Sequence, residues 1–439
     1  MARFFNTAGP CRPDLHYMVD PLRRIERLRR LIDRQSYFVV HGPRQTGKTT
    51  SLLSLAAALA QEGRYAAALL SLEVGRAFPE DVGAAEAAIL QSFREDASYQ
   101  LPSDLRPPPW PDGAPGHRLA AALAAWAQAC PRPLVLFLDE IDALTGPTLL
   151  SALSQLRGGH RRRPQGFPWA IALVGMRDVR DYKVTAGEGA QLGSASPFNV
   201  KEESVLLRDF TREEVSGLYA QHTADTGQVF APEAIDLAFQ LTCGQPWLIN
   251  ALAREMVDEL VPDRSVALQP AHVRAARDAI VLRQDTHLDS LAERLQEDRV
   301  RAVLEPILAG STLGAVPEDD QRYAMDLGLV RQAEGGALEI ANPIYGEILP
   351  RAVRDCGCFS RRRSVARAER GSPAAEGRAR HRARRGARWL GRTVSRIDLD
   401  SYASSIERPM PTDREQPCPS SEAITRRRRP QRAPPPACR

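Results

Sequence analysis

The sequence predicts an α/β protein built on a parallel sheet, followed by a helical segment, a small α/β module and a basic tail. Three observations support this fold class. Short apolar runs alternate with helical patterns as far as residue 207. A glycine-rich motif joins the first apolar run to the next helix. From residue 211 the apolar runs stop while helical patterns continue. Strands that are apolar throughout, with helices between them, are typical of a parallel sheet buried on both faces.

The composition fits a globular protein of two or three domains. The chain has 439 residues, of which 43% are hydrophobic and 26% charged, and no run has the apolar length of a transmembrane helix. Residues 1–7 lack the long apolar core of a secretory signal. We therefore expect a cytoplasmic protein with no membrane partner. Cys11, Cys130 and Cys243 lie far apart in the sequence, which predicts free, reduced thiols.

The elements of the α/β part can be placed from periodicity. A helical pattern starts at Leu22, with Ile25 and Leu28 on its apolar face and arginines on a face that we expect to be solvated. The expected strands are 37–40, 66–72, 134–138, 169–175 and 204–207. The expected helices between them are 51–59, 80–97, 119–129 and 147–156, with a proline-rich loop at 102–115 and a basic loop at 158–168.

The motif after the first strand predicts a phosphate-binding loop. Residues 42–49 fit G-x-x-x-x-G-K-[ST], and lysine occurs at only three positions in the chain, which makes a chance match rare. Glycine lets the backbone turn its N–H groups inward, and the following helix N-terminus favours anions. The expected nucleotide-binding residues are Gly42, Pro43, Arg44, Gln45, Thr46, Gly47, Lys48, Thr49 and Thr50. Lys48 would reach the β- and γ-phosphates, and Thr49 would bind Mg²⁺ through its hydroxyl.

An acidic pair ends the third apolar strand and completes the expected hydrolytic site. Asp139 and Glu140 follow Leu134–Leu138 about 90 residues after the glycine motif. Asp139 would hold Mg²⁺ through water, and Glu140 would polarise the water that attacks the γ-phosphate of ATP. The alternative is a solvated strand end. The pair favours hydrolysis, because we find no acceptor pocket for transfer to a second substrate.

Two further features are candidates for sensing the phosphate. Arg177 follows the fourth strand, where a cation could stabilise phosphate charge, although it could equally pair with Asp178 or Asp181 on the surface. Arg180 is a weaker candidate for the same role. Gly244-Gln245-Pro246 forms a rigid turn that could touch the nucleotide, or simply join two helices.

The last third of the chain contains a second module and a tail. Thr211 and Glu214 form a capping box, and helices are expected at 232–241 and 247–260. Helices at 299–308 and 321–328, then strands at 329–331 and 337–340, suggest a winged helix, with a last helix at 344–353. Residues 356–439 hold 21 Arg and 8 acidic residues and should be disordered. This tail is either an arm for nucleic acid or a non-functional, frame-disturbed extension, and we favour the second.

These motifs together resemble the AAA+/STAND group of P-loop ATPases, and within it the bacterial AAA-like ATP-binding proteins. The resemblance covers roughly residues 4–260. The stretches that carry it are 17–21, 42–50, 134–142, 175–180, 206–215 and 244–246. The phosphate loop and the acidic strand are specific for the superfamily, and Phe210-Thr211-x-x-Glu214 with the Gly-x-Pro turn is typical of STAND proteins.

The resemblance implies a sheet of order 5-1-4-3-2 and four regions. They are an ATPase core at 1–208, a helical lid at 209–265, a winged-helix-like domain at 266–355 and the tail at 356–439. Tyr17 and Val19 would cover the adenine and Pro246 would contact the nucleotide. Related AAA+ proteins often carry a sensor arginine near the place of Pro246, which puts a contact between the lid and the γ-phosphate in doubt.

The leading hypothesis is a Mg²⁺-dependent switch ATPase that couples ATP or ADP binding to an unidentified protein partner in signalling or defence, with a homo-oligomer as one possible form. The alternative is a DNA-binding ATPase resembling origin-recognition proteins, acting through the winged helix. A third reading is a nucleotide-dependent scaffold without turnover, which Asp139 and Glu140 weigh against.

Overall fold

The computed structural model describes residues 3–178, 200–283 and 294–350, apart from residues 296, 312, 315 and 334. The predictions for Arg180 and for the tail at 356–439 fall outside these residues.

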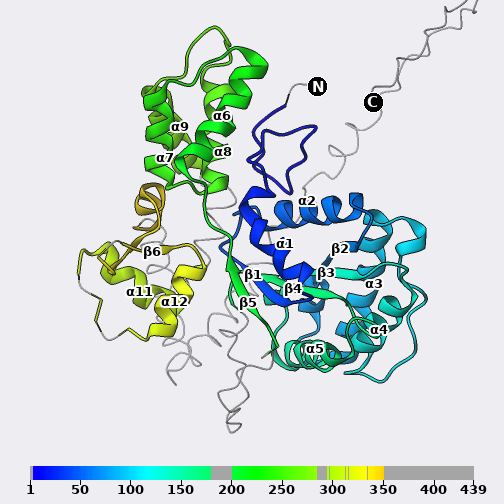
Figure 1. The fold of residues 1–439 in the computed structure, drawn as a ribbon. Coiled ribbons are helices and arrows are strands. Elements are labelled where there is room, and N and C mark those ends of the chain that lie inside the picture. Colours follow the sequence, from blue (N-terminus) through cyan, green and yellow to red (C-terminus); the bar gives the residue numbers. More distant parts are fainter. Residues whose placement is uncertain are drawn as a thin grey trace, which may run out of the picture. The chain divides into compact units, whose positions relative to one another are not determined.

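Five parallel strands form the central sheet in the order β2-β3-β4-β1-β5 (Figure 1). The strands are β1 (Tyr37–His41), β2 (Ala66–Ser71), β3 (Leu134–Asp139), β4 (Ala170–Gly175) and β5 (Glu203–Leu206). In the register of the sheet, Val39 of β1 lies opposite Leu173 on one side and Ser204 on the other. The order is 5-1-4-3-2 read from the other edge, so this prediction is confirmed.

Helices cover both faces of the sheet because alternate residues of each strand point to opposite sides. In β1, Tyr37 and Val39 join one apolar cluster, while Phe38 and Val40 join another. The first cluster takes its other side chains from α3 (Val82–Gln100), α4 (Arg118–Ala129) and α5 (Gly146–Gly159). The second takes them from α1 (Glu26–Asp33) and α2 (Lys48–Gln61). This explains why the strands are apolar throughout.

A helical bundle follows the sheet. It contains α6 (Arg212–Thr226), α7 (Pro232–Thr242), α8 (Pro246–Arg254), a π-helical turn (Glu255–Leu260) and α9 (Pro270–Arg283). The predicted capping box is present, since Thr211 accepts from the Glu214 amide and Glu214 accepts from the Thr211 amide. Helix α9 packs against α7 and α8. The lid boundary at residue 265 stays a prediction, and α9 packs with the helices that precede it.

The last described module has the predicted order of two helices and a hairpin. It contains α11 (Asp298–Leu308), α12 (Glu318–Asp326), and the antiparallel strands β6 (Val330–Gln332) and β7 (Leu338–Ile340). Residues 343–350 are helical. Its apolar side chains belong to the same buried cluster as those of the bundle. Its identity as a winged helix stays a prediction.

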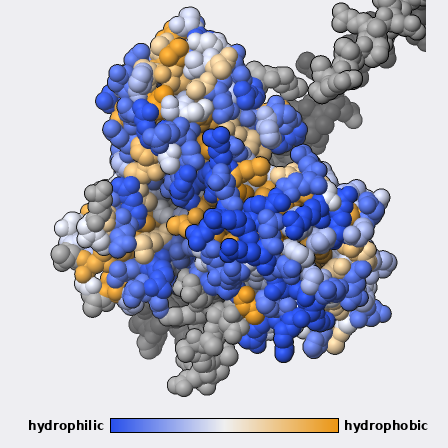
Figure 2. Space-filling view, viewed as in Figure 1, coloured by the Kyte–Doolittle hydropathy of each residue, from blue (hydrophilic) through white to orange (hydrophobic). Residues whose placement is uncertain are grey.

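The face of the molecule seen in Figure 2 is mostly hydrophilic, with hydrophobic residues in small groups. Among the described helices, none combines the length and the apolar character needed to cross a membrane.

The helix expected from Leu22 is broken into two pieces. A 3₁₀ turn at Arg23–Ile25 precedes α1, which begins at Glu26. The break matters because it directs Arg24 toward the phosphate loop instead of the solvated face that the arginine pattern suggested.

Candidate nucleotide-binding site

The loop between β1 and α2 has the backbone that a phosphate cradle needs. Gly47 adopts a φ of 88° and caps α2, a conformation that favours glycine. Gly42 allows a close approach, since a Cβ there would lie 3.0 Å from the Leu207 carbonyl oxygen. Thr46 Oγ1 donates to the Pro43 carbonyl at 3.0 Å and steadies the loop.

The Lys48 side chain lies folded into this loop. Its Nζ donates to the carbonyl oxygens of Gly42 and Pro43, both at 2.7 Å. Burial lowers the pKa of Lys48, and the nearby carboxylates of Asp139, Asp142 and Glu140 oppose this effect. The ammonium group is therefore enclosed by groups of opposite polarity, at the N-terminus of α2.

The acidic end of β3 lies directly against the loop. Thr49 Oγ1 donates to Asp139 Oδ2 at 2.9 Å, and the Glu140 amide donates to Asp139 Oδ1 at 2.9 Å. Burial raises the pKa of Asp139, with the hydrogen bond from Thr49 acting against it. Burial also raises the pKa of Glu140, and the negative charges of Asp142 and Asp139 add to this effect. A raised pKa suits Glu140 to accept a proton.

The oxygen atoms at this point fit Mg²⁺. Hard divalent cations prefer oxygen ligands, and Mg²⁺ in phosphate-loop sites is held by one or two protein groups, with the remaining positions filled by waters and phosphates. Thr49 Oγ1 and Asp139 Oδ2 are adjacent beside the loop, where Asp139 is buried and Thr49 is half-buried. No cluster of three or more His, Cys, Asp or Glu side chains in the described ranges forms a protein-only metal site. The oxygen atoms of Thr49 and Asp139 fit a Mg²⁺ site whose remaining positions would be filled by waters and phosphates.

A pocket of about 130 Å³ adjoins the phosphate loop. Its lining includes Gly47 and Thr50 at the start of α2, together with Val19 and with Pro246 of α8. Its full lining is Asn6, Thr7, Ala8, Gly9, Cys11, Tyr17, Met18, Val19, Pro21, Arg24, Gln45, Gly47, Thr50, Ser51, Phe210, Leu218, Pro246, Trp247 and Asn250. Its position beside the phosphate loop suits the base and sugar of a nucleotide.

The segment of residues 3–18, which we call the N-terminal strap, forms one wall of this pocket. Phe5 is only 1% exposed and packs among Tyr17, Tyr219 and other aromatic rings of the bundle. The Cys11 amide donates to Thr50 Oγ1 at 3.1 Å, which ties the strap to α2.

Side chains of helices α6 and α8 form hydrogen bonds with the backbone of the strap. Gln221 accepts from the Met18 amide at 3.2 Å and donates to the Met18 carbonyl at 2.7 Å. Trp247 Nε1 donates to the Thr7 carbonyl at 2.9 Å. The strap therefore connects the bundle to the helix that carries Lys48.

Arg24 connects the phosphate loop to the linker between the sheet and the bundle. Its guanidinium donates to the Thr46 carbonyl at 3.0 Å and also to the Arg208 carbonyl, and it lies 4.8 Å from the centre of the Phe210 ring. Burial lowers the pKa of Arg24 to about 10. At neutral pH it remains a cation, and it holds the phosphate loop at the Thr46 carbonyl.

The Gly244-Gln245-Pro246 turn packs on the same linker. The Phe210 amide donates to the Gly244 carbonyl at 2.9 Å, and a Cβ on Gly244, whose φ is 79°, would lie 2.0 Å from the Phe210 carbonyl oxygen. Gln245 caps α8 by accepting from the Leu248 amide. The turn therefore lies against the linker backbone and at the pocket wall through Pro246.

Arg177 and Pro43 both meet the last module. The Arg177 guanidinium lies 4.8 Å from the centre of the Tyr323 ring of α12. Gly328 packs so closely on Pro43 that a Cβ there would lie 2.7 Å from the proline side chain. Residues of the last module therefore contact both the phosphate loop and the residue expected to sense the γ-phosphate.

The structure brings most of the predicted site residues together. Lys48, Thr49, Asp139 and Glu140 share one location, and Tyr17, Val19 and Pro246 line the adjoining pocket. Their individual roles stay predictions, as does sensing by Arg177. Sequence reasoning predicted Tyr17, near the end of the strap, but missed residues 3–16 and Asn250, because these belong to no motif. The hydrophobic pair Phe4-Phe5 is a further signal for the strap.

Comparisons with known proteins give one family match and a set of similar folds. Residues 23–164 match a family model described as the AAA ATPase domain. No curated protein matches the sequence.

A solved Walker-type ATPase of Pyrococcus abyssi has a TM-score of 0.51 at 14% identity, covering 79% of this chain and 99% of that one. RuvB of Thermotoga maritima, a Holliday junction branch migration motor, scores 0.38 at 15% identity and covers 72% of this chain and 89% of its own. Cdc6p from Pyrobaculum aerophilum scores 0.40 at 12% identity, with coverages of 76% and 92%. At these identities the likeness concerns the fold alone.

Proposed function

Because this chain is a P-loop ATPase of the AAA+ class, we propose that it is a switch that binds ATP with Mg²⁺, hydrolyses it, and passes the nucleotide state to a protein partner. The ATPase core would supply the chemistry. The bundle and the last module would carry the response, as in the STAND proteins that the sequence resembles. The output in signalling or defence and the identity of the partner belong to the same proposal.

The chemistry is assigned to the residues at the end of β3 and in the phosphate loop. Lys48 would exchange its bonds to the loop carbonyls for phosphate oxygens. Thr49 and Asp139 would hold Mg²⁺, which when bound neutralises charge on the β- and γ-phosphates. Glu140 would accept a hydrogen bond from the attacking water and orient it, since burial beside two carboxylates makes it a better base.

The observation that carries the switch proposal is the double contact between the last module and the site. Pro43 belongs to the phosphate loop and touches Gly328, while Arg177 touches Tyr323. A ligand that moves the loop or attracts Arg177 would change both contacts. This supports a response in the module when the γ-phosphate is present.

Two variants test the catalytic part of the proposal. Lys48→Ala should weaken Mg²⁺-dependent ATP binding by about a hundredfold, because it removes a buried cation from the phosphates. Glu140→Gln should keep ATP affinity and lower turnover about a hundredfold or more, because the amide cannot accept the proton. Binding is measured by calorimetry and turnover by phosphate release.

The control is Glu95→Gln, which makes the same chemical change on the exposed side of α3. It should leave binding and turnover unchanged. The proposal is wrong if the unsubstituted protein binds neither ATP nor ADP in the presence of Mg²⁺.

The alternative of a DNA-binding ATPase finds little support in the charges of the last module. Several of its arginines each pair with a carboxylate of the same module. These pairs are Arg294–Glu297, Arg299–Asp320, Arg301–Asp298, Arg322–Glu318 and Arg331–Glu339. A surface that binds the DNA backbone needs cations available for phosphates. We therefore keep the switch as the proposed function.

A further inference from the structure

The pocket beside the phosphate loop contains buried polar atoms that no protein group satisfies. Asn250 of α8 and Ser51 of α2 are among its lining residues and are 7% and 1% exposed. Asn250 Oδ1 and Ser51 Oγ are shielded from solvent and have no hydrogen-bond partner in the protein. An unsatisfied buried polar atom costs about 1–3 kcal/mol, so such atoms in a pocket wall point to a ligand that completes them.

The orientation of the Asn250 amide is fixed by its other end. Its Nδ2 donates to the Pro246 carbonyl at 2.8 Å, one turn earlier in α8. If the amide were reversed, two oxygen acceptors would face each other, which is unfavourable. The atom left over is therefore an acceptor, and its complement in a ligand is a hydrogen-bond donor.

The pocket is lined both by Gly47 of the phosphate loop and by Asn250, so a nucleotide with its phosphates on the loop could place its base in this pocket. An exocyclic amino group is the donor by which adenine differs from hypoxanthine and guanine at position 6 of the purine ring. We propose that Asn250 Oδ1 accepts a hydrogen bond from the 6-amino group of adenine, and that Asn250 thereby determines the base specificity of this site. The inference rests on the proposed function, because it takes the pocket to be a nucleotide site.

The hydrogen bond from Asn250 Nδ2 to the Pro246 carbonyl should make the preference for adenine over 6-oxo purines strong. A 6-oxo purine would bring an acceptor toward Oδ1, and the amide could adapt only by reversing and losing its bond to Pro246. A purine with no group at position 6 would leave Oδ1 buried and unpaired. Sites built around a buried hydrogen bond discriminate strongly against ligands that lack the partner.

The test compares three triphosphates by calorimetry in the presence of Mg²⁺. They are ATP, inosine triphosphate and purine riboside triphosphate, which differ at position 6 while keeping the sugar and phosphates. The unsubstituted full-length protein should bind ATP at least about tenfold more tightly than either analogue. In Asn250→Leu, which is similar in size and has no acceptor, the three affinities should agree within about threefold.

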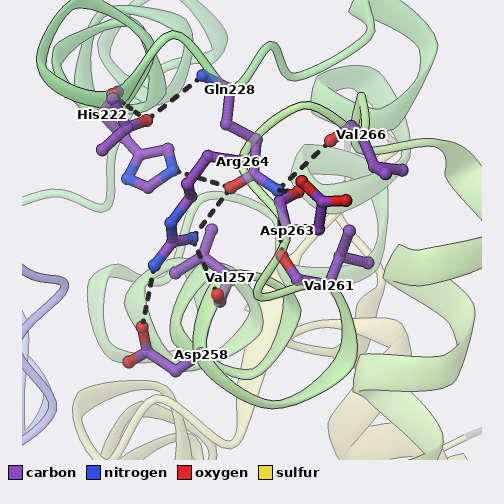
Figure 3. Close-up of polar contacts among 9 residues, drawn as sticks. His222, Gln228, Val257, Asp258, Val261, Asp263, Arg264 and Val266 are labelled. Atoms are coloured by element: carbon purple, nitrogen blue, oxygen red, sulfur yellow. Dashed lines mark hydrogen bonds and ion pairs between the residues drawn. The ribbon is translucent and has the colours of Figure 1, made fainter.

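The matched control is Gln228→Met, a change of the same kind inside the bundle and away from the pocket lining. Gln228 is fully buried, donates to the Val261 carbonyl at 3.0 Å and accepts from Arg264 at 2.9 Å (Figure 3). Loosening the bundle there should weaken all three nucleotides alike and preserve the preference for ATP.

The outcomes separate the two proposals. If the unsubstituted protein binds all three triphosphates equally, Asn250 does not select the base, and the inference fails while nucleotide binding stands. The same holds if Asn250→Leu keeps the full preference. If none of the three binds, the proposed function itself fails. Equal binding of the three triphosphates by the unsubstituted protein refutes the inference even if Asn250→Leu does not fold.

Discussion

The anchoring of the N-terminal strap by Phe5 can be tested by comparing Phe5→Ala with Phe4→Ala. Phe5 is 1% exposed, with ring centres of Tyr17 and Tyr219 at 4.8 and 5.7 Å. Phe4, the adjacent residue, is 45% exposed. The two variants delete the same atoms from neighbouring positions, so their difference isolates burial.

The magnitude follows from what holds the strap. Burying a phenylalanine contributes about 2–3 kcal/mol, and its aromatic contacts add about 1 kcal/mol. The ion pair between Arg3 and Asp225 contributes little, because both side chains are about a third exposed, at 31% and 33%. Phe5→Ala should therefore cost about 3 kcal/mol. Because the strap can detach by itself, this loss should appear as local opening and leave the bundle folded.

The assay is hydrogen exchange at strap amides. The Phe4 amide donates to Leu15, and the Cys11 amide donates to Thr50. A loss of about 3 kcal/mol corresponds to exchange about a hundredfold faster at both amides. Phe4→Ala should change exchange by less than about threefold. Equal effects of the two variants, or no acceleration in Phe5→Ala, would refute the assignment of Phe5 as the anchor.

Three further predictions concern the linker and its neighbours. Gly244→Ala should destabilise the protein by about 2–4 kcal/mol, because its Cβ would lie 2.0 Å from the Phe210 carbonyl oxygen. The control Gly217→Ala lies in open space on α6 and should be neutral or slightly stabilising. Chemical denaturation of both variants measures the difference. Arg24→Met should weaken ATP binding about tenfold, because the Thr46 carbonyl loses its hydrogen bond. Arg23→Met, which changes a side chain that is 82% exposed, should leave ATP binding unchanged. Calorimetry measures the affinity of both variants. Burial raises the pKa of Asp209 to about 6, so its contribution to the unfolding free energy is fully present below about pH 4. As the pH rises through 6, the unfolding free energy should fall by up to about 3 kcal/mol. Asp209→Asn should remove this dependence in unfolding free energies measured between pH 4 and 7.

The sequence predicted those parts of the site whose geometry is determined by residues close together in the chain. A phosphate loop is continuous from Gly42 to Thr50, so its motif carries its own geometry. The acidic residues end a strand, and parallel strands bring their carboxyl ends to the same edge. The sheet order followed from the family resemblance and not from the strand pattern, since apolar runs do not reveal which strands pair.

The parts that sequence reasoning missed depend on contacts between distant residues. Arg24 looked like one of many arginines on a solvated helix face, because its periodicity gives no sign of the 3₁₀ turn that redirects it. Asn250 lies in an otherwise apolar helix, and only the burial of its amide shows that it lacks a partner. The strap contains no periodic pattern that would indicate its position against Gln221 and Trp247.

The division of the site between distant segments has a mechanical consequence. The residues proposed for the phosphates, such as Lys48 and Asp139, belong to the core, whereas the pocket proposed for the base also takes residues from the strap and α8. A ligand that bound only through its phosphates would make no direct contact with α8, while a nucleotide that also engages Asn250 would be linked to α8 and, through Trp247 and Thr7, to the strap. Under the proposal, base recognition and the position of the bundle are coupled in free energy. If so, Phe5→Ala should lower the affinity for ATP more than the affinity for inorganic triphosphate, which has no base to read.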